Sequence, residues 1–228
     1  MKKLITLLLV AVLCLCTVAC NSNASTDSSA APTASTAAPS DDAQQALNAA
    51  RGHLDAMSYS YLGLIEQLEA DGYTHEAAES AVDSLNVDWT LQAMQSAGTY
   101  LQYGAYSYEG LCRVLAVEQY PSEQIQAAME ACEADWNVQA LKAANAYVEE
   151  IPFSYTGLKE ALLMDGFTNE EAEYGADNIQ ADWNEQAYRR AQEHLADQKY
   201  RNEELMRLLE QEGFTQEQAH YAVEKSGQ

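Results

Sequence analysis

The fold is decided by residues 153–183, FSYTGLKEALLMDGFTNEEAEYGADNIQADW, which contain the signals of two short helices separated by a tight turn. Ser154 stands where the N-cap of a helix is expected, and Asp165-Gly166 is typical of a helix C-terminus. Thr168 and Glu171 have the spacing of a capping box that starts the next helix. Two short helices joined by a glycine-containing turn predict a helix-turn-helix unit.

The same pattern recurs along the chain with a period of 47 residues. Trp89, Trp136 and Trp183 follow one another at this spacing, and an aspartate precedes each of them. Glycines, leucines and a Gln-Ala pair recur in step with the tryptophans. This periodicity predicts tandem repeats at residues 43–89, 90–136, 137–183 and 184–228.

Each repeat is predicted to hold three short helices, so the fold class is an all-α tandem array. In the first repeat, a helix over residues 43–57 precedes a break at Ser58-Tyr59-Ser60. A second helix ends near Asp71-Gly72, and a third starts at Thr74 with an apolar stripe that ends at Trp89. An α-solenoid of the HEAT type has a similar period but would have two long helices in each unit.

Two arrangements remain open between repeats. The chain lacks Gly and Pro around Trp89, which favours one continuous helix running from each repeat into the next. The alternative is a sharp bend, with Asn137 and Asn184 acting as N-caps.

Glycine recurs inside the second helix at Gly63, Gly110 and Gly157. Glycine in a helix costs about 1 kcal/mol relative to alanine, so its recurrence predicts a close helix contact, beneath the aromatic residue that precedes the helix. The fourth repeat has Glu204 in place of this glycine and Arg201 in place of the capping serine. Such departures are typical of a terminal, capping repeat.

The N-terminal segment is predicted to direct export. Lys2 and Lys3 precede an apolar run at residues 4–19, which is short for a membrane-spanning helix and typical of a signal peptide over residues 1–19. Thr17-Val18-Ala19-Cys20 resembles a bacterial lipobox, so Cys20 is the predicted lipidation site. Residues 20–42, rich in Ser, Thr, Ala and Pro, are predicted to form a disordered linker.

The charge balance excludes nucleic acid as a partner. The chain has 35 acidic and 12 basic residues, and loss of Lys2 and Lys3 with the signal peptide leaves a net charge of −25. Phosphate backbones require Lys and Arg for affinity, and a DNA-reading helix-turn-helix requires a basic recognition helix. Here the third helix of the third repeat is strongly acidic.

The sequence predicts neither an enzyme nor a metal or cofactor site. His53 and His194 share a repeat position that tyrosines occupy elsewhere, which indicates a packing position rather than a general base. No spacing of His or Cys suggests metal ligation, and no glycine-rich phosphate loop is present. Cys112 and Cys132 either form a disulfide or are two small apolar core residues, and the second reading is favoured.

Acidic residues that recur at the repeat period are the candidate binding residues. They fall into three sets: Glu76, Glu123 and Glu170, with Glu217 in step in the fourth repeat; Asp83, Glu130 and Asp177; and Asp88, Asp135 and Asp182. Rows of acidic side chains would attract a basic protein partner at fast, salt-sensitive rates. The plainer alternative is a solvated face with acids that favour the helix dipole.

The residues quoted from 153–183, with the continuation Asp182-Trp183-Asn184, resemble the Ltp-like repeat of host cell-surface-exposed lipoproteins from Gram-positive bacteria and their temperate phages. The resemblance covers all four repeats and is weakest in the second, where Gln119-Tyr120-Pro121 replaces Gly-Phe-Thr. It implies a non-enzymatic lipoprotein on the outer face of the bacterial membrane. Phage-encoded members act in superinfection exclusion, in which acidic repeats engage a basic phage protein. An envelope or adhesive lipoprotein with another ligand is the alternative.

Overall fold

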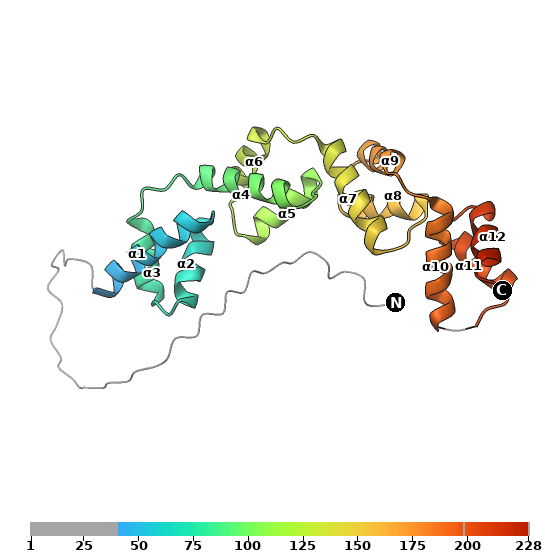
Figure 1. Cartoon of the computed structure of the whole chain (residues 1–228). Helices are drawn as coiled ribbons and strands as arrows, with labels where there is room; N and C mark the ends of the chain where they lie inside the picture. Colours follow the sequence, from blue (N-terminus) through green and yellow to red (C-terminus); the bar gives the residue numbers. More distant parts are fainter. Residues whose placement is uncertain (1–40, 198, 228) are drawn as a thin grey trace. The chain divides into compact units, whose positions relative to one another are not determined.

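The computed structural model describes residues 41–197 and 199–227, and every regular element in these ranges is an α-helix (Figure 1). The predicted all-α fold is therefore confirmed. None of the described helices is long and apolar enough to span a bilayer. The predicted signal peptide, Cys20 and nearly all of the predicted linker lie outside the described residues.

The helices form four groups of three, one group for each repeat. Their bounds are α1 (Asp41–Ala56), α2 (Tyr61–Ala70) and α3 (His75–Asp83); α4 (Trp89–Tyr103), α5 (Tyr108–Val117) and α6 (Ser122–Ala131); α7 (Trp136–Glu150), α8 (Tyr155–Met164) and α9 (Asn169–Asn178); and α10 (Trp183–Asp197), α11 (Asn202–Gln211) and α12 (Gln216–Lys225). Extensive helix–helix contacts within the described ranges join members of the same group. Three short helices per repeat confirm the predicted unit and exclude the solenoid with two long helices.

Each repeat has its own hydrophobic core, built from two leucines of the second helix and alanines of the first and third. In the first repeat, Leu64 and Leu68 are fully buried against Ala46 and Ala78. Burying a leucine completely stabilises the fold by about 1.5–3 kcal/mol. Because alanine has a small side chain, the first and third helices can approach each other closely over these leucines.

The chain between repeats is not one continuous helix, so that prediction is wrong. Helix α3 ends at Asp83, and α4 begins at Trp89 after a non-helical stretch. Asp88 is the N-cap of α4, with an extended backbone at φ −82° and ψ 97°, and its Oδ1 accepts from the backbone N–H groups of Thr90 and Leu91. The capping carboxylate satisfies the free N–H groups of the new helix, which stabilises a break where no Gly or Pro is present.

Aspartate caps the third and fourth repeats in the same way, rather than Asn137 and Asn184. Asp135 Oδ1 accepts from the N–H of Asn137 at 3.0 Å, and Asp182 Oδ1 accepts from the N–H of Asn184 at 3.0 Å. The first repeat begins correspondingly at Asp41, so α1 extends two residues into the stretch predicted as linker.

The tryptophans link neighbouring repeats. Trp89 is the first residue of α4, yet its half-buried ring packs against the core of the first repeat and meets the Tyr61 ring edge-on at 5.6 Å. Trp136 and Trp183 make the same contacts with the second and third repeats. The tryptophans at which the predicted apolar stripes end therefore pack against the cores, although each belongs to the first helix of the following repeat.

Candidate functional site

A hydrogen bond from a serine recurs between neighbouring repeats. Ser107 Oγ donates to the backbone carbonyl oxygen of Asp165 at 2.6 Å, and the same Oγ accepts from the N–H of Gly110 at 2.8 Å. Ser60 and Ser154 repeat this geometry with the carbonyl groups of Glu118 and Glu212. The serine thus caps a helix in its own repeat and binds the next repeat, and we name this contact the repeat junction.

The helix glycine is required by the repeat junction. A Cβ atom on Gly110 would lie 3.0 Å from Ser107 Oγ and 3.3 Å from the carbonyl oxygen of Asp165. The expectation of a contact beneath the preceding aromatic residue is wrong at Gly63 and Gly110, where the near atoms belong to the junction. Only at Gly157 does an aromatic carbon, Phe153 Cδ1 at 3.6 Å, also approach.

The residue that supplies the junction carbonyl is acidic, and its carboxylate is held inside its own repeat. Tyr147 OH donates to Asp165 Oδ2 at 2.6 Å, and Tyr100 OH binds Glu118. His53 and His194 contact Asp71 and Glu212 from the equivalent position. His and Tyr interchange here because both can donate a hydrogen bond, so the position is more than the predicted packing slot.

The partners of the acidic residue that supplies the junction carbonyl differ between the repeats, and so do the resulting pKa shifts. Burial and the hydrogen bonds to carboxylates raise the pKa of Tyr100 and Tyr147 above the usual tyrosine value. Burial disfavours the charged form of Glu212, but the bonds from Arg190 Nε and Nη2, at 2.8 and 2.7 Å, and from His194 outweigh it. The pKa of Glu212 is therefore lowered, and this carboxylate is ionised at neutral pH.

Most of the predicted binding residues have structural partners. Asp88, Asp135 and Asp182 cap helices, as described above. Asp83 and Asp177 accept at 2.7 Å from the hydroxyl groups of Tyr61 and Tyr155, and these bonds are the main reason that the pKa of each tyrosine rises to about 12. Glu130 accepts from Gln126 Nε2 at 2.8 Å. These six acids stabilise their own repeats.

The remaining three, Glu76, Glu123 and Glu170, differ from the others. Each lies exposed in the first turn of the third helix of its repeat. Within the described residues, no hydrogen bond or ion pair engages their carboxylates. They are therefore the recurring acids that remain available to a partner, beyond their favourable interaction with the helix dipole.

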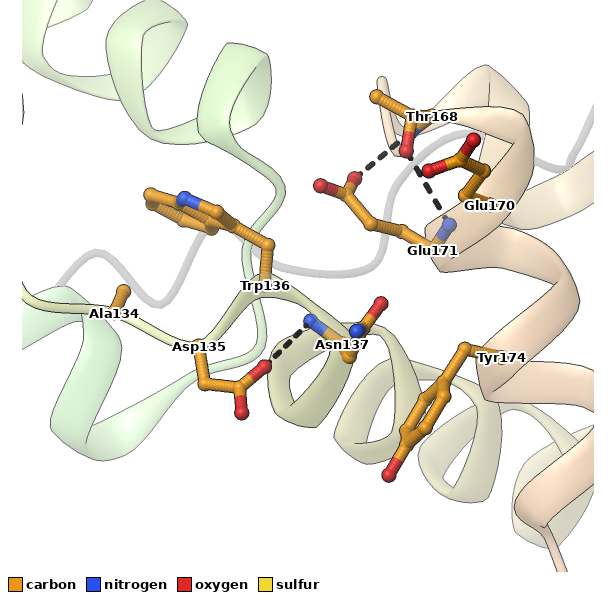
Figure 2. Close-up of a pocket in the computed structure, with 8 residues that line it drawn as sticks. All are labelled: Ala134, Asp135, Trp136, Asn137, Thr168, Glu170, Glu171 and Tyr174. Atoms are coloured by element: carbon orange, nitrogen blue, oxygen red, sulfur yellow. Dashed lines mark hydrogen bonds between the residues drawn. The ribbon is translucent and has the colours of Figure 1, made fainter.

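Two of the predicted residues come together in one open groove of about 450 Å³ in the third repeat (Figure 2). Asp135, at the start of α7, and Glu170, at the start of α9, both line it. Glu171 is also in the groove wall, but its carboxylate closes the capping box by accepting from the N–H of Thr168. Figure 2 shows these side chains around the same opening.

The cysteines are separate in the structure. Cys112 and Cys132 are both free and half-buried, and Cys112 packs against the core of the second repeat. This agrees with the favoured reading of two small apolar residues. In residues 41–197 and 199–227, no three His, Cys, Asp or Glu side chains are grouped so that they could hold a metal ion.

The sequence did not reveal the repeat junction. Its components, a serine, a helix glycine and the acid before the turn, lie far apart along the chain, and only their shared 47-residue period connects them. The signal that could have indicated the junction is the fourth repeat, where Arg201 and Glu204 replace the serine and the glycine together. There the two side chains form an ion pair at 2.6 Å instead.

Comparison with protein families identifies the repeats. The family model described as host cell surface-exposed lipoprotein matches residues 41–85, 135–179 and 182–225. These segments correspond to the first, third and fourth helix groups, and the second repeat, which keeps the same three helices, lies outside them. A search of curated proteins finds no match. Because the matched segments cover more than half of the chain, it belongs to the host cell surface-exposed lipoprotein family.

Proposed function

We propose that this chain is a non-enzymatic lipoprotein, held outside the cell by a lipid on Cys20, whose acidic repeats bind a basic protein partner. The observation that carries the proposal is the set of exposed, structurally unused carboxylates of Glu76, Glu123 and Glu170. They recur once in each of the first three repeats. A repeated site suits a partner that presents several basic groups, because linked contacts raise the overall affinity.

Most of the negative charge of the first three repeats is not compensated by basic side chains. Residues 43–183 contain 23 acidic and four basic residues. Of these basic side chains, Arg113 donates to the carbonyl oxygen of Asp165, and Lys142 donates to that of Leu101. Such an excess steers basic proteins toward the repeats and disfavours binding to anionic membrane surfaces.

The fourth repeat is less suited to this role because its six basic residues offset most of the charge of its nine acidic residues. Arg190 pairs with Glu193 and Glu212, and Lys225 pairs with Glu185 at 2.5 Å. We therefore assign partner binding to the first three repeats and a capping role to the fourth.

Within this function, the specific role proposed is superinfection exclusion, in which a basic protein of an incoming phage is captured before DNA entry. The resemblance to phage-encoded members of the family supports this role. A passive capture mechanism also needs only a binding surface, which is what the exposed acids would provide.

The test measures phage adsorption and phage DNA entry in cells that display the full chain. Replacing Glu76, Glu123 and Glu170 with Gln is expected to restore DNA entry while leaving adsorption and the amount of displayed protein unchanged. The matched control replaces Glu203, Glu210 and Glu224 of the fourth repeat, which removes the same charge, and should still exclude DNA. Equal DNA entry with and without the chain would reject exclusion and leave an envelope or adhesive role as the alternative.

A further inference from the structure

The second repeat contains an apolar groove of about 490 Å³ between α4 and α6. Met94, Ala97 and Leu101 of α4 form one side, and Ala128 and Cys132 form the other. This volume lies within the range of about 300–1,000 Å³ that is typical of ligand pockets. The opening is therefore large enough to accept an apolar side chain.

The groove is wider here partly because one side chain that packs against the core in other repeats is shorter in the second repeat. Cys132 occupies the repeat position of Leu85 and Ile179, both of which pack against the cores of their own repeats. Gly98 lines the groove and occupies the position of Asn145, an exposed residue that donates to the carbonyl oxygen of Leu141 in its own helix. A Cβ atom on Gly98 would meet nothing within 4 Å, so the backbone does not require glycine there. Glycine leaves this part of the groove wall without a side chain, so a larger residue at position 98 would extend into open space.

A buried polar atom also borders the groove without a partner. Gln139 is 6% exposed, and its Oε1 has no hydrogen-bond partner among the described atoms. In the neighbouring repeats, the equivalent Gln92 and Gln186 accept from backbone N–H groups at 3.3 Å. An unpaired buried acceptor is costly, but Oε1 has almost no exposed surface, so a donor on a bound segment would reach it only after the Gln139 side chain rotates.

The rim of the groove is acidic. Glu133 and Asp135 line it, and through Ala134 and Asp135 it adjoins the groove of Figure 2, which adds Glu170 and Glu171. Neither groove has a Lys or Arg in its described lining. One basic side chain, Lys142, contacts a lining residue, because its Nζ donates to the carbonyl oxygen of Leu101 at 3.4 Å.

We propose that this groove docks an apolar side chain of a partner segment in which Lys or Arg residues flank that side chain. The inference rests on the proposed function and deepens it, because it adds an apolar anchor to charge attraction. A second copy of the chain is disfavoured by the net charge of −25 that each copy carries after leader removal. The linker at residues 21–40 has neither a basic residue nor a large apolar one, so it lacks the required chemistry.

The test uses the full mature chain and two labelled peptides that serve as probes. One peptide carries a single Leu flanked by Lys residues in a Gly/Ser background, and the other has Ser in place of that Leu. Fluorescence anisotropy measures both against the wild-type chain and against a Gly98→Asn/Cys132→Ile variant, which copies the third repeat. The matched control, Gly52→Asn/Cys112→Ile, makes the same types of change away from the groove. Circular dichroism and thermal melting verify that every variant is folded.

Replacing the peptide's Leu with Ser is expected to weaken binding to the wild-type chain and to the control variant by about tenfold or more. The Gly98→Asn/Cys132→Ile variant should lose this discrimination. In mass-spectrometric alkylation, the Leu peptide should protect Cys132 and leave the labelling of Cys112 unchanged.

Equal affinity of both peptides for the wild-type chain, or the same Leu preference in the filled variant, would overturn the inference. If both peptides bind equally and the Glu76, Glu123 and Glu170 replacements abolish binding, the acidic surface is the binding site and the groove is not. If neither peptide binds, the groove proposal fails, while the DNA-entry assay still decides the proposed function independently.

Discussion

The hydroxyl group of Ser154 in the third repeat donates a 2.6 Å hydrogen bond to the backbone carbonyl oxygen of Glu212 in the fourth. The carboxylate of the same Glu212 binds Arg190 and His194 of its own repeat. Glu212 therefore contacts two repeats: its carboxylate binds side chains of the fourth repeat, and its carbonyl group binds the N-cap serine of a helix in the third. The equivalent contacts of Ser60 and Ser107 make this a property of the array.

Replacing Ser154 with Ala should destabilise the chain by more than the loss of an ordinary helix cap. The change removes the bond to the N–H of Gly157 and the bond to Glu212, for an expected cost of about 2 kcal/mol in the free energy of unfolding. The control is Thr168→Ala, which removes a cap in the same repeat with no bond to a neighbouring repeat and should cost about 1 kcal/mol. Urea denaturation measures both, and equal costs would argue against the junction.

Two Gly-to-Ala substitutions should change stability in opposite directions. At Gly52, in α1, an added Cβ meets nothing within 4 Å, so alanine should stabilise the chain by about 0.5–1 kcal/mol. At Gly110, the Cβ would lie 3.3 Å from the carbonyl oxygen of Asp165. The junction must then shift, which should cost about 1 kcal/mol or more. Thermal melting of the two variants tests this, and stabilisation by both would contradict the close approach.

Replacing Glu212 with Gln should produce a pH-dependent loss of stability. Because the pKa of Glu212 is lowered in the folded state, its contribution is present above the unfolded-state pKa of about 4.3 and is lost as pH falls through the folded-state pKa. The variant should lose about 1.5–3 kcal/mol at pH 7 and converge with the wild type in acid. Denaturation at several pH values measures this difference. The control is Glu210→Gln, at an exposed residue. A stability difference between the Glu212 variant and the wild type that does not change with pH would contradict the pairing of Glu212 with Arg190 and His194.

Removing a capping acid and removing an exposed acid should affect stability differently. Asp135→Ala removes the α7 cap and should cost about 0.5–2 kcal/mol in stability. Glu123→Ala removes an exposed carboxylate and should change stability by less than about 0.5 kcal/mol. Denaturation curves distinguish the two, and a large cost at Glu123 would mean that this acid is structural after all.

Lipid attachment should depend on Cys20 alone. Cys20→Ser is expected to move the protein from the membrane fraction into the culture medium, because the lipid chains supply the anchoring energy. Cys16→Ser, at a second cysteine near the end of the predicted signal peptide that follows the bulky Leu15, is the matched control and should leave the protein in the membrane fraction. Cell fractionation followed by immunoblotting locates both variants. Membrane retention of the Cys20 variant would reject the proposed anchor.

Local signals were sufficient to predict much of the fold. The capping serines, the Asp-Gly and Gly-Phe turns and the capping boxes act within four residues, so their sequence positions indicate where helices start and stop. The break between repeats was missed because an aspartate cap ends a helix without Gly or Pro. In the second repeat, Gln119 adopts φ +65° at the turn where Gly72, Gly166 and Gly213 serve elsewhere, so the fold tolerates the loss of that signal.

The sequence by itself determined the 47-residue period, the three helices of each repeat and the acidic charge, because each depends on neighbours along the chain or on composition. Only the tertiary structure decided which acids are used and which remain free. It also placed Ser107 against Asp165 and opened the groove beside Cys132. These features join residues from different helices or different repeats, and their distances depend on how the helices pack.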